Sequence, residues 1–103
     1  MKIGYWNDTV TVMKPDGETV VAEDCFWRRR TRFVYDGGRR REEDLFLCRV
    51  PGEADIRPGD ILALGAVEAE NAEAYLTEHP ESCFRAAKVS YGKRGARCEG
   101  ASL

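Results

Sequence analysis

The sequence lacks recognisable enzyme signatures. Its one histidine, His79, is followed by a proline and has no evident serine or cysteine partner. The patterns of serine hydrolases (G-x-S-x-G), P-loops and zinc proteases (H-E-x-x-H) do not occur. Because nothing supplies a nucleophile, a base and an orienting group together, we predict that the protein is not an enzyme and uses no cofactor.

Closely spaced cysteines are also missing. The four cysteines are widely separated, without a Cys-x-x-Cys pair, so no structural metal site is predicted. A disulfide framework is not expected without a secretory signal. Cys25, Cys48 and Cys83 fall in apolar stretches typical of strands, which predicts small buried side chains.

Long hydrophobic runs are absent as well. The longest apolar stretch, Ile61 to Val67, is too short to cross a bilayer. Met1 to Val12 is polar and alternating, unlike a signal peptide. We therefore expect synthesis in a cytoplasm and no membrane partner.

Charge, by contrast, is abundant and unevenly distributed. The 103 residues suit one domain, 1–103, with 33% charged and 43% hydrophobic residues and a net charge of −2. Between Cys25 and Val50, eight arginines stand against four acidic residues. One basic segment on an acidic body predicts a molecule that presents two different surfaces.

Alternating apolar residues and turn signals predict a mainly β fold. Leu45 to Val50, for example, places Phe46, Cys48 and Val50 on one face. The other predicted strands are 3–13, 18–27, 33–35, 61–67, 84–91 and 96–99, and the predicted turns lie at 14–17, 36–38, 57–60 and 92–95.

One segment has helical spacing. Glu68 to Glu78 is rich in Ala, Glu and Leu and is followed by His79-Pro80, which predicts a short helix that ends there. The expected architecture is a small antiparallel β-barrel or sandwich of about six strands, with one short helix and a long charged hairpin loop at 28–44.

The hairpin supplies the candidate contact residues. Arginines on a protruding hairpin can contact DNA phosphates without reading sequence, and an acidic partner protein would suit them equally well. A solvated hairpin with cross-strand ion pairs is the simpler alternative, since Glu42, Glu43 and Asp44 follow directly. The candidates are Arg28, Arg29, Arg30, Arg32, Arg39, Arg40 and Arg41.

The Gly92-Lys93-Arg94-Gly95 turn could hold a phosphate through its amides and two cations. However, a single short loop of this composition is more typical of an ordinary solvated turn than of a phosphate-binding loop.

Taken in order, the motifs resemble a known family. They run from WNDTVTV through CFW to a long variable segment, then LFLCRVP, RPGDILALG, a short acidic helix and FRAAKVSYGKRGA. This pattern is similar to the minor capsid, or head-closure, proteins of tailed bacteriophages, which connect head and tail. The match covers nearly the whole chain, and its most specific parts are Cys25-Phe26-Trp27 and Gly59 to Gly65. Two features depart from the family pattern: Cys98 stands where relatives often carry histidine, and the basic segment is richer in arginine.

The resemblance implies a β-barrel subunit of the virion that forms a homo-oligomeric ring below the portal. Such a ring closes or extends the portal DNA channel, with portal or adaptor proteins and tail proteins as partners and non-specific contact with packaged DNA. It also implies that the segment between CFW and VP is a mobile loop. The alternative from a different class is a free-standing small β-barrel module that binds nucleic acid.

Overall fold

The protein folds into six strands and one short helix. The structure, a computed structural model, describes residues 6–101, so the first three residues of the predicted strand 3–13 lie outside the described part. The elements are β1 (Asp8–Met13), β2 (Thr19–Asp36), β3 (Arg39–Val50), β4 (Ile61–Leu64), α1 (Ala72–Glu78), β5 (Cys83–Gly92) and β6 (Gly95–Ala101).

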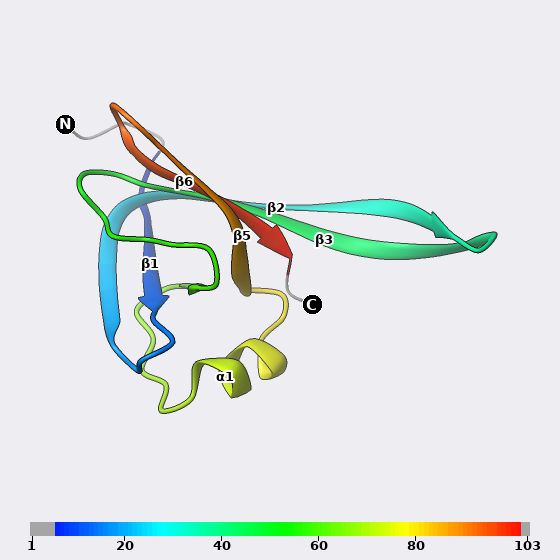
Figure 1. The fold of residues 1–103 in the computed structure, drawn as a ribbon, viewed down its shortest axis with the longest axis horizontal. Helices are drawn as coiled ribbons and strands as arrows, with labels where there is room; N and C mark the ends of the chain where they lie inside the picture. Colours follow the sequence, from blue (N-terminus) through cyan, green and yellow to red (C-terminus); the bar gives the residue numbers. More distant parts are fainter. Residues whose placement is uncertain (1–5, 102–103) are drawn as a thin grey trace.

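All neighbouring strands pair antiparallel and close on themselves in the order β1-β2-β3-β6-β5-β4, with β4 returning to β1. Figure 1 shows this small barrel with α1 beneath it. The prediction of a mainly β fold with one short helix and a long charged hairpin is confirmed, and the barrel is the form it takes.

Strand β2 turns a corner of the barrel. Its first part, up to Cys25, pairs with β1, and from Phe26 onward it pairs with β3. The register against β1 shifts between Asp8 and Val10, and Asp24 has a left-handed backbone (φ 57°). A bulge of this kind bends a strand and re-aims the side chains that follow it. Here it turns β2 from its pairing with β1 to its pairing with β3 (Figure 1).

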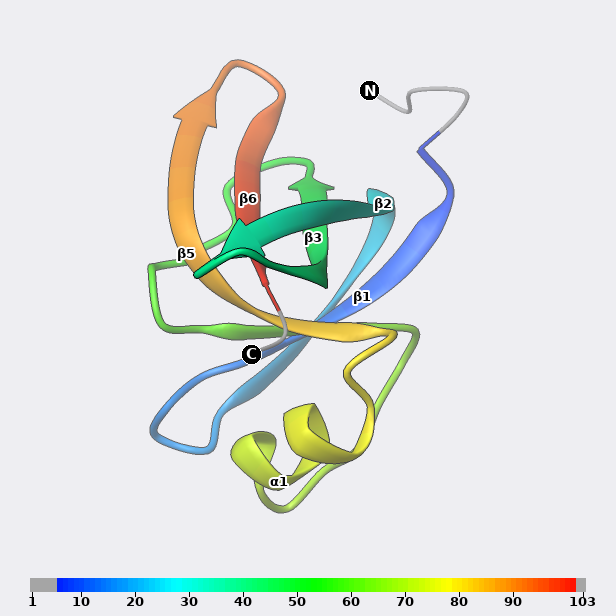
Figure 2. The same cartoon turned by 90° about the vertical axis from the view of Figure 1, so that its right-hand side faces the viewer.

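Beyond the barrel, β2 and β3 continue as a two-stranded ribbon. The outermost pairs run from Thr31 opposite Asp44 to Asp36 opposite Arg39, and none of these residues pairs with a third strand. Six pairs at about 3.4 Å each extend the ribbon roughly 20 Å. Figure 2 looks along the ribbon toward the barrel.

The barrel interior is filled by alternating side chains. Phe46 and Phe84 stack with ring centroids 5.2 Å apart and planes at 3°, and Trp27 packs edge-on against both rings. Such aromatic pairs add about 0.5–1.5 kcal/mol to the stabilisation from burial alone. The remaining core side chains are Val10, Val12, Cys25, Cys48, Val50, Ile56, Leu62, Ala86, Ala96 and Cys98.

A second apolar cluster lies between the outside of the barrel wall and α1. Leu76 of the helix packs with Met13, Ile61, Ala63 and Cys83. The helix starts at its N-cap Asn71, whose side chain accepts a hydrogen bond from the Ala74 amide (3.1 Å). Within residues 6–101, no helix has the length and apolarity needed to span a membrane.

Buried polar groups tie the loops to this wall. The Thr11 hydroxyl donates to the Gly65 carbonyl (2.7 Å) and accepts from the Val67 amide (2.9 Å). Asp60 is 2% exposed and accepts hydrogen bonds from the Lys14 side chain and the Arg57 amide. Paired in this way, these groups avoid the cost of unsatisfied burial.

The predicted turns are confirmed. Residues 14–17 close through a hydrogen bond from the Gly17 amide to the Lys14 carbonyl, and 57–60 through one from Asp60 to Arg57. Gly37 and Gly38 both have positive φ, as the two-residue turn of a hairpin requires.

Several element boundaries differ from the prediction. The strand predicted at 3–13 begins at Asp8, and the strand predicted at 45–50 begins at Arg39. The separate strands predicted at 18–27 and 33–35 are one strand, β2, so the hairpin loop shrinks to a two-residue turn. The strand predicted at 61–67 ends at Leu64, since Gly65 has φ 94° and its amide bonds to Thr9. The helix predicted from Glu68 begins only at Ala72.

We predict that Gly95→Ala destabilises the fold. An added Cβ at Gly95 would lie 2.0 Å from the Val50 carbonyl oxygen, and the residue has φ 118°. A backbone clash combined with left-handed strain should cost at least about 2 kcal/mol in the free energy of unfolding. Gly92 in the same turn has open space around it and serves as the matched control. Urea unfolding measures both, and equal losses for the two variants would contradict the prediction.

Candidate functional site: an arginine-rich ribbon

The pairing of β2 with β3 sorts the ribbon side chains onto two faces. Residues directly opposite in an antiparallel pair lie on the same face, and successive residues alternate. Trp27 lies opposite the buried Cys48, so odd-numbered residues of this part of β2 continue the interior face. Even-numbered residues, beginning with Arg28 opposite Leu47, continue the outer face.

We call the outer surface of the β2–β3 ribbon and the adjoining strand β6 the basic face. Seven arginines lie on it, against three acidic side chains. The pairings that define it run from Arg49 opposite Arg97 to Asp36 opposite Arg39, about 30 Å at the strand rise. Its charged residues are Arg28, Arg30, Arg32, Arg39, Arg41, Arg49 and Arg97, with Asp36, Glu43 and Glu99.

Few of these arginines are neutralised within the protein. Arg32 pairs with Glu43 (2.9 Å) and Arg97 with Glu99 (2.9 Å). Within residues 6–101, the other five arginines of the basic face form no ion pair. Arg49 and Arg97 also lie directly opposite each other, an arrangement of like charges that disfavours the free protein. An anionic partner would relieve this repulsion.

A small hollow lies where the ribbon leaves the barrel. Its volume is about 220 Å³, with Leu45 and Leu47 in its floor and Arg28, Arg30 and Arg97 among its lining residues. Both leucines are partly exposed on the outer face. A molecule bound at this point would therefore contact apolar side chains that are flanked by arginines.

The opposite side of the ribbon, the aromatic face, carries no net charge. It consists of Arg29, Thr31, Phe33, Tyr35, Arg40, Glu42 and Asp44. Phe33 and Tyr35 are 51% and 74% exposed, and the Arg40 guanidinium lies over the Phe33 ring, 4.0 Å from its centroid. Cations in this position are attracted by the electron-rich ring face.

The base of the aromatic face is fixed by hydrogen bonds. Asp44 accepts from the Thr31 hydroxyl (2.7 Å) and from Arg29 (2.8 Å), and these contacts lower the pKa of the Asp44 carboxyl. Arg29 also donates to the Glu81 carbonyl (3.5 Å) in the loop after α1. The aromatic face is therefore turned toward the α1 side of the molecule at its base, and the basic face is turned away.

The structure thus divides the seven predicted contact arginines into two sets. Five of them lie on the basic face, whereas Arg29 and Arg40 lie on the aromatic face. Sequence reasoning missed Arg49 and Arg97. Alternation within 45–50 was enough to turn Arg49 outward, but the pairing of β3 with β6 that brings Arg97 beside it has no local sequence signal.

The turn at 92–95 lies at the barrel end of the basic face. A cavity of about 300 Å³ there is lined by four basic side chains, Arg49, Lys93, Arg94 and Arg97, together with Trp6 and Tyr91. The basic character of the ribbon therefore continues onto this end of the barrel.

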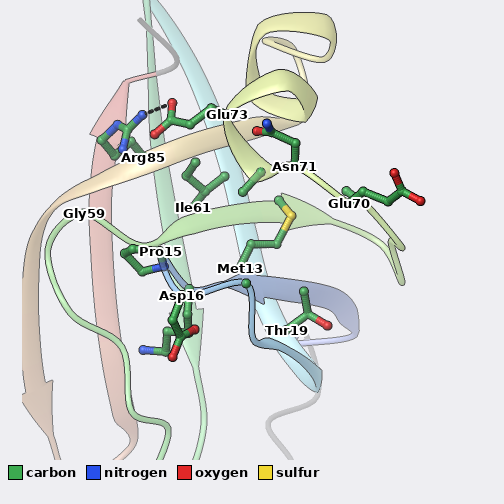
Figure 3. A pocket seen from close by; sticks show the side chains of 14 residues that line it. Met13, Pro15, Asp16, Thr19, Gly59, Ile61, Glu70, Asn71, Glu73 and Arg85 are labelled. Carbon is green, nitrogen blue, oxygen red and sulfur yellow. Dashed lines mark hydrogen bonds and ion pairs between the residues drawn. The ribbon is translucent and has the colours of Figure 1, made fainter.

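A groove lies at the other end of the molecule, between the β1–β2 turn and the start of α1. Its volume is about 370 Å³. Figure 3 shows Met13 and Ile61 on its inner side, with Glu70, Asn71 and Glu73 on the α1 side. Arg85 pairs with Glu73, and this contact lowers the pKa of the Glu73 carboxyl.

Comparisons with protein-family profiles, characterised proteins and solved structures find no match for the chain.

The four cysteines are free thiols in the interior. Cys25, Cys48 and Cys98 belong to the barrel core, and Cys83 packs beneath α1. Burial is the main cause that raises the pKa of Cys25 and Cys83 to about 12 and that of Cys98 to about 11. Within the described residues, no group of three or more His, Cys, Asp or Glu side chains could hold a metal ion.

The ribbon arginines should be dispensable for the fold. Replacing Arg39, Arg40 and Arg41 together by Ser removes exposed side chains at the ribbon tip, so we expect Tm to stay near that of the wild type. Thermal unfolding followed by circular dichroism measures this. A sharp fall in Tm would mean that the tip arginines hold the structure together and would remove the basis for treating them as contact residues.

The buried thiols should make stability fall at high pH. Above the ordinary thiol pKa of 9.0, the unfolded chain releases thiol protons that the folded chain keeps up to about pH 11–12. The unfolded state then binds fewer protons, so the free energy of unfolding decreases from about pH 9, by up to ~1.4 kcal/mol per pH unit for each thiol. Urea unfolding across this range should show a shallower decrease for Cys98→Ala than for the wild type, and parallel curves would contradict the assignment.

Proposed function

We propose that the protein is a structural subunit of the head–tail connector of a tailed bacteriophage virion. Copies form a ring that closes or extends the portal DNA channel, between portal or adaptor proteins and tail proteins. The observation that carries the proposal is the basic ribbon, a charged arm that projects from a closed barrel. The motif order of the sequence supports the connector assignment.

The form of the ribbon suits assembly. Two-stranded ribbons are marginally stable alone in water, so this arm gains from contact with a neighbour. Its basic face lies on the side turned away from α1, where another layer of an assembly can reach it. In a ring, each copy adds one such contact, and modest individual affinities combine into strong binding through multivalency.

The ribbon fits phosphates or acidic protein surfaces better than it fits exposed bases. Proteins that bind single strands use aromatic rings beside a basic groove, so that bases stack while phosphates are neutralised. Here Phe33 and Tyr35 lie on the face opposite the five ribbon arginines. This separation favours the connector over a free-standing nucleic-acid-binding module.

Electron microscopy of the protein mixed with a candidate portal protein tests the proposal. We expect an added ring of density on the portal, and the layer should be weakened in a variant with Arg28, Arg30 and Arg41 replaced by Ser. A protein with Arg57 replaced by Ser, which loses an exposed arginine away from the ribbon, is the control.

Two results would count against the connector. One is the absence of any added layer on the portal under several salt and protein concentrations. The other is tight binding of the monomer to duplex DNA at physiological salt, which would favour the nucleic-acid-binding alternative.

A further inference from the structure

The exposed aromatics of the ribbon are not explained by its basic face. Tyr35 and Phe33 lie near the tip, on the face without net charge, and more than half of each side chain is exposed. Aromatic side chains of this kind contribute strongly when an interface covers them, since each brings a large apolar area with few rotatable bonds. Covering this face would also support a ribbon that has no third strand.

The groove beside α1 has complementary features. Met13, Ile61, Ala69 and Ala72 provide apolar lining, and Asp16 and Glu70 contribute carboxylates (Figure 3). The two cations near it are already engaged, Lys14 with Asp60 and Arg85 with Glu73. Within residues 6–101, neither Asp16 nor Glu70 forms an ion pair. Asp16 accepts a hydrogen bond from the Glu18 amide (2.9 Å), so Glu70 is the carboxylate better placed to receive a cation.

Ribbon tip and groove match in size and charge. The groove volume of about 370 Å³ is near the lower end of the range of roughly 300–1,000 Å³ found for small-molecule sites. That volume suits one aromatic ring accompanied by a guanidinium. The Arg40 guanidinium, which lies over the Phe33 ring, would come close to Glu70 when the aromatic face enters the groove.

The ribbon of one molecule does not reach its own groove. In Figure 1 the ribbon points away to the right, whereas the β1–β2 turn that borders the groove lies at the lower left. Regular pairing from Thr31 to Arg39 keeps the ribbon extended rather than folded back. A ribbon tip that enters this groove must therefore belong to another molecule.

We propose that this groove binds the ribbon tip of a second copy of the chain, with Tyr35 or Phe33 against its apolar lining and Arg40 beside Glu70. The contact joins two different surfaces, so it is heterologous and generates a ring or an open chain of subunits. It deepens the proposed function by naming the contact between neighbouring copies, and it leaves the basic face free for other components.

A mixing experiment tests the contact directly. The receiver is ¹⁵N-labelled protein carrying Phe33→Ser and Tyr35→Ser, which keeps the groove but lacks the aromatic tip. Unlabelled wild-type protein is the donor, added up to millimolar concentration because single contacts within rings are weak alone. We expect amide shifts in the receiver that concentrate on Met13, Ile61 and 69–73.

Two donors serve as controls. Unlabelled receiver protein, which has no aromatic tip, should cause no shifts. Val21→Ser removes an apolar side chain that is equally exposed (50%) but lies away from the tip, so this donor should bind like the wild type.

A charge exchange tests the pairing of Arg40 with Glu70. Glu70→Arg in the receiver should weaken binding about tenfold, and a donor with Arg40→Glu should recover much of the loss. Both side chains are exposed, so neither change threatens the fold.

The proposal is overturned if the wild-type donor shifts no groove residue, if the shifts fall elsewhere, or if the donor without the tip shifts the same residues. These outcomes are separable from failure of the connector function. A ring on the portal without groove shifts would leave the connector standing and remove this contact. Groove shifts without a portal layer would do the reverse.

Discussion

The pairing of β2 with β3 is the constraint on which the functional surfaces depend. Because side chains alternate along a strand, a slip of one residue would exchange the two faces of the ribbon. The bulge beside Asp24 decides which residues of β2 point inward. Before it the even-numbered Ala22 faces the core, and after it the odd-numbered Cys25 and Trp27 do. The packed rings of Phe46, Phe84 and Trp27 then fix this alternation at the base of the ribbon. An arrangement of core aromatics therefore decides where the arginines lie outside it.

The core that stabilises the fold and the ribbon proposed to contact partners are different parts of the molecule. The barrel core and the cluster beneath α1 contain the buried apolar side chains, whereas all ribbon arginines are exposed. Most surface substitutions change stability little, so the ribbon can vary in charge without loss of the fold. Its use of arginine over lysine also matters, since the planar guanidinium binds carboxylates and phosphates in a fixed geometry.

Local patterns predicted much of the fold. The turns at 14–17 and 57–60 carry proline and glycine where the backbone requires them, and the strand predicted at 45–50 alternates clearly. The sequence did not predict that β2 is continuous, because a run of arginines has no apolar alternation. Cross-strand pairing with β3 keeps this part of the chain extended. The helix α1 starts at Ala72 because Asn71 caps it, whereas the earlier part of the predicted helix lies in a loop that Thr11, from a distant strand, holds through Gly65 and Val67. The sequence also could not predict which arginines share a face of the ribbon, because the bulge at Asp24 that sets the alternation has no local signature.

The ribbon also bears on how the protein stays dispersed. A closed barrel has no free strand edge, but both edges of the ribbon beyond Thr31 and Asp44 are open along their backbone. Open edges invite pairing with other chains, and natural sheets discourage this with charged side chains. Along β3, three arginines followed by three acidic residues meet that need, and half of these charged side chains belong to the basic face. The charges proposed to meet a partner therefore also discourage identical ribbons from joining into extended sheets.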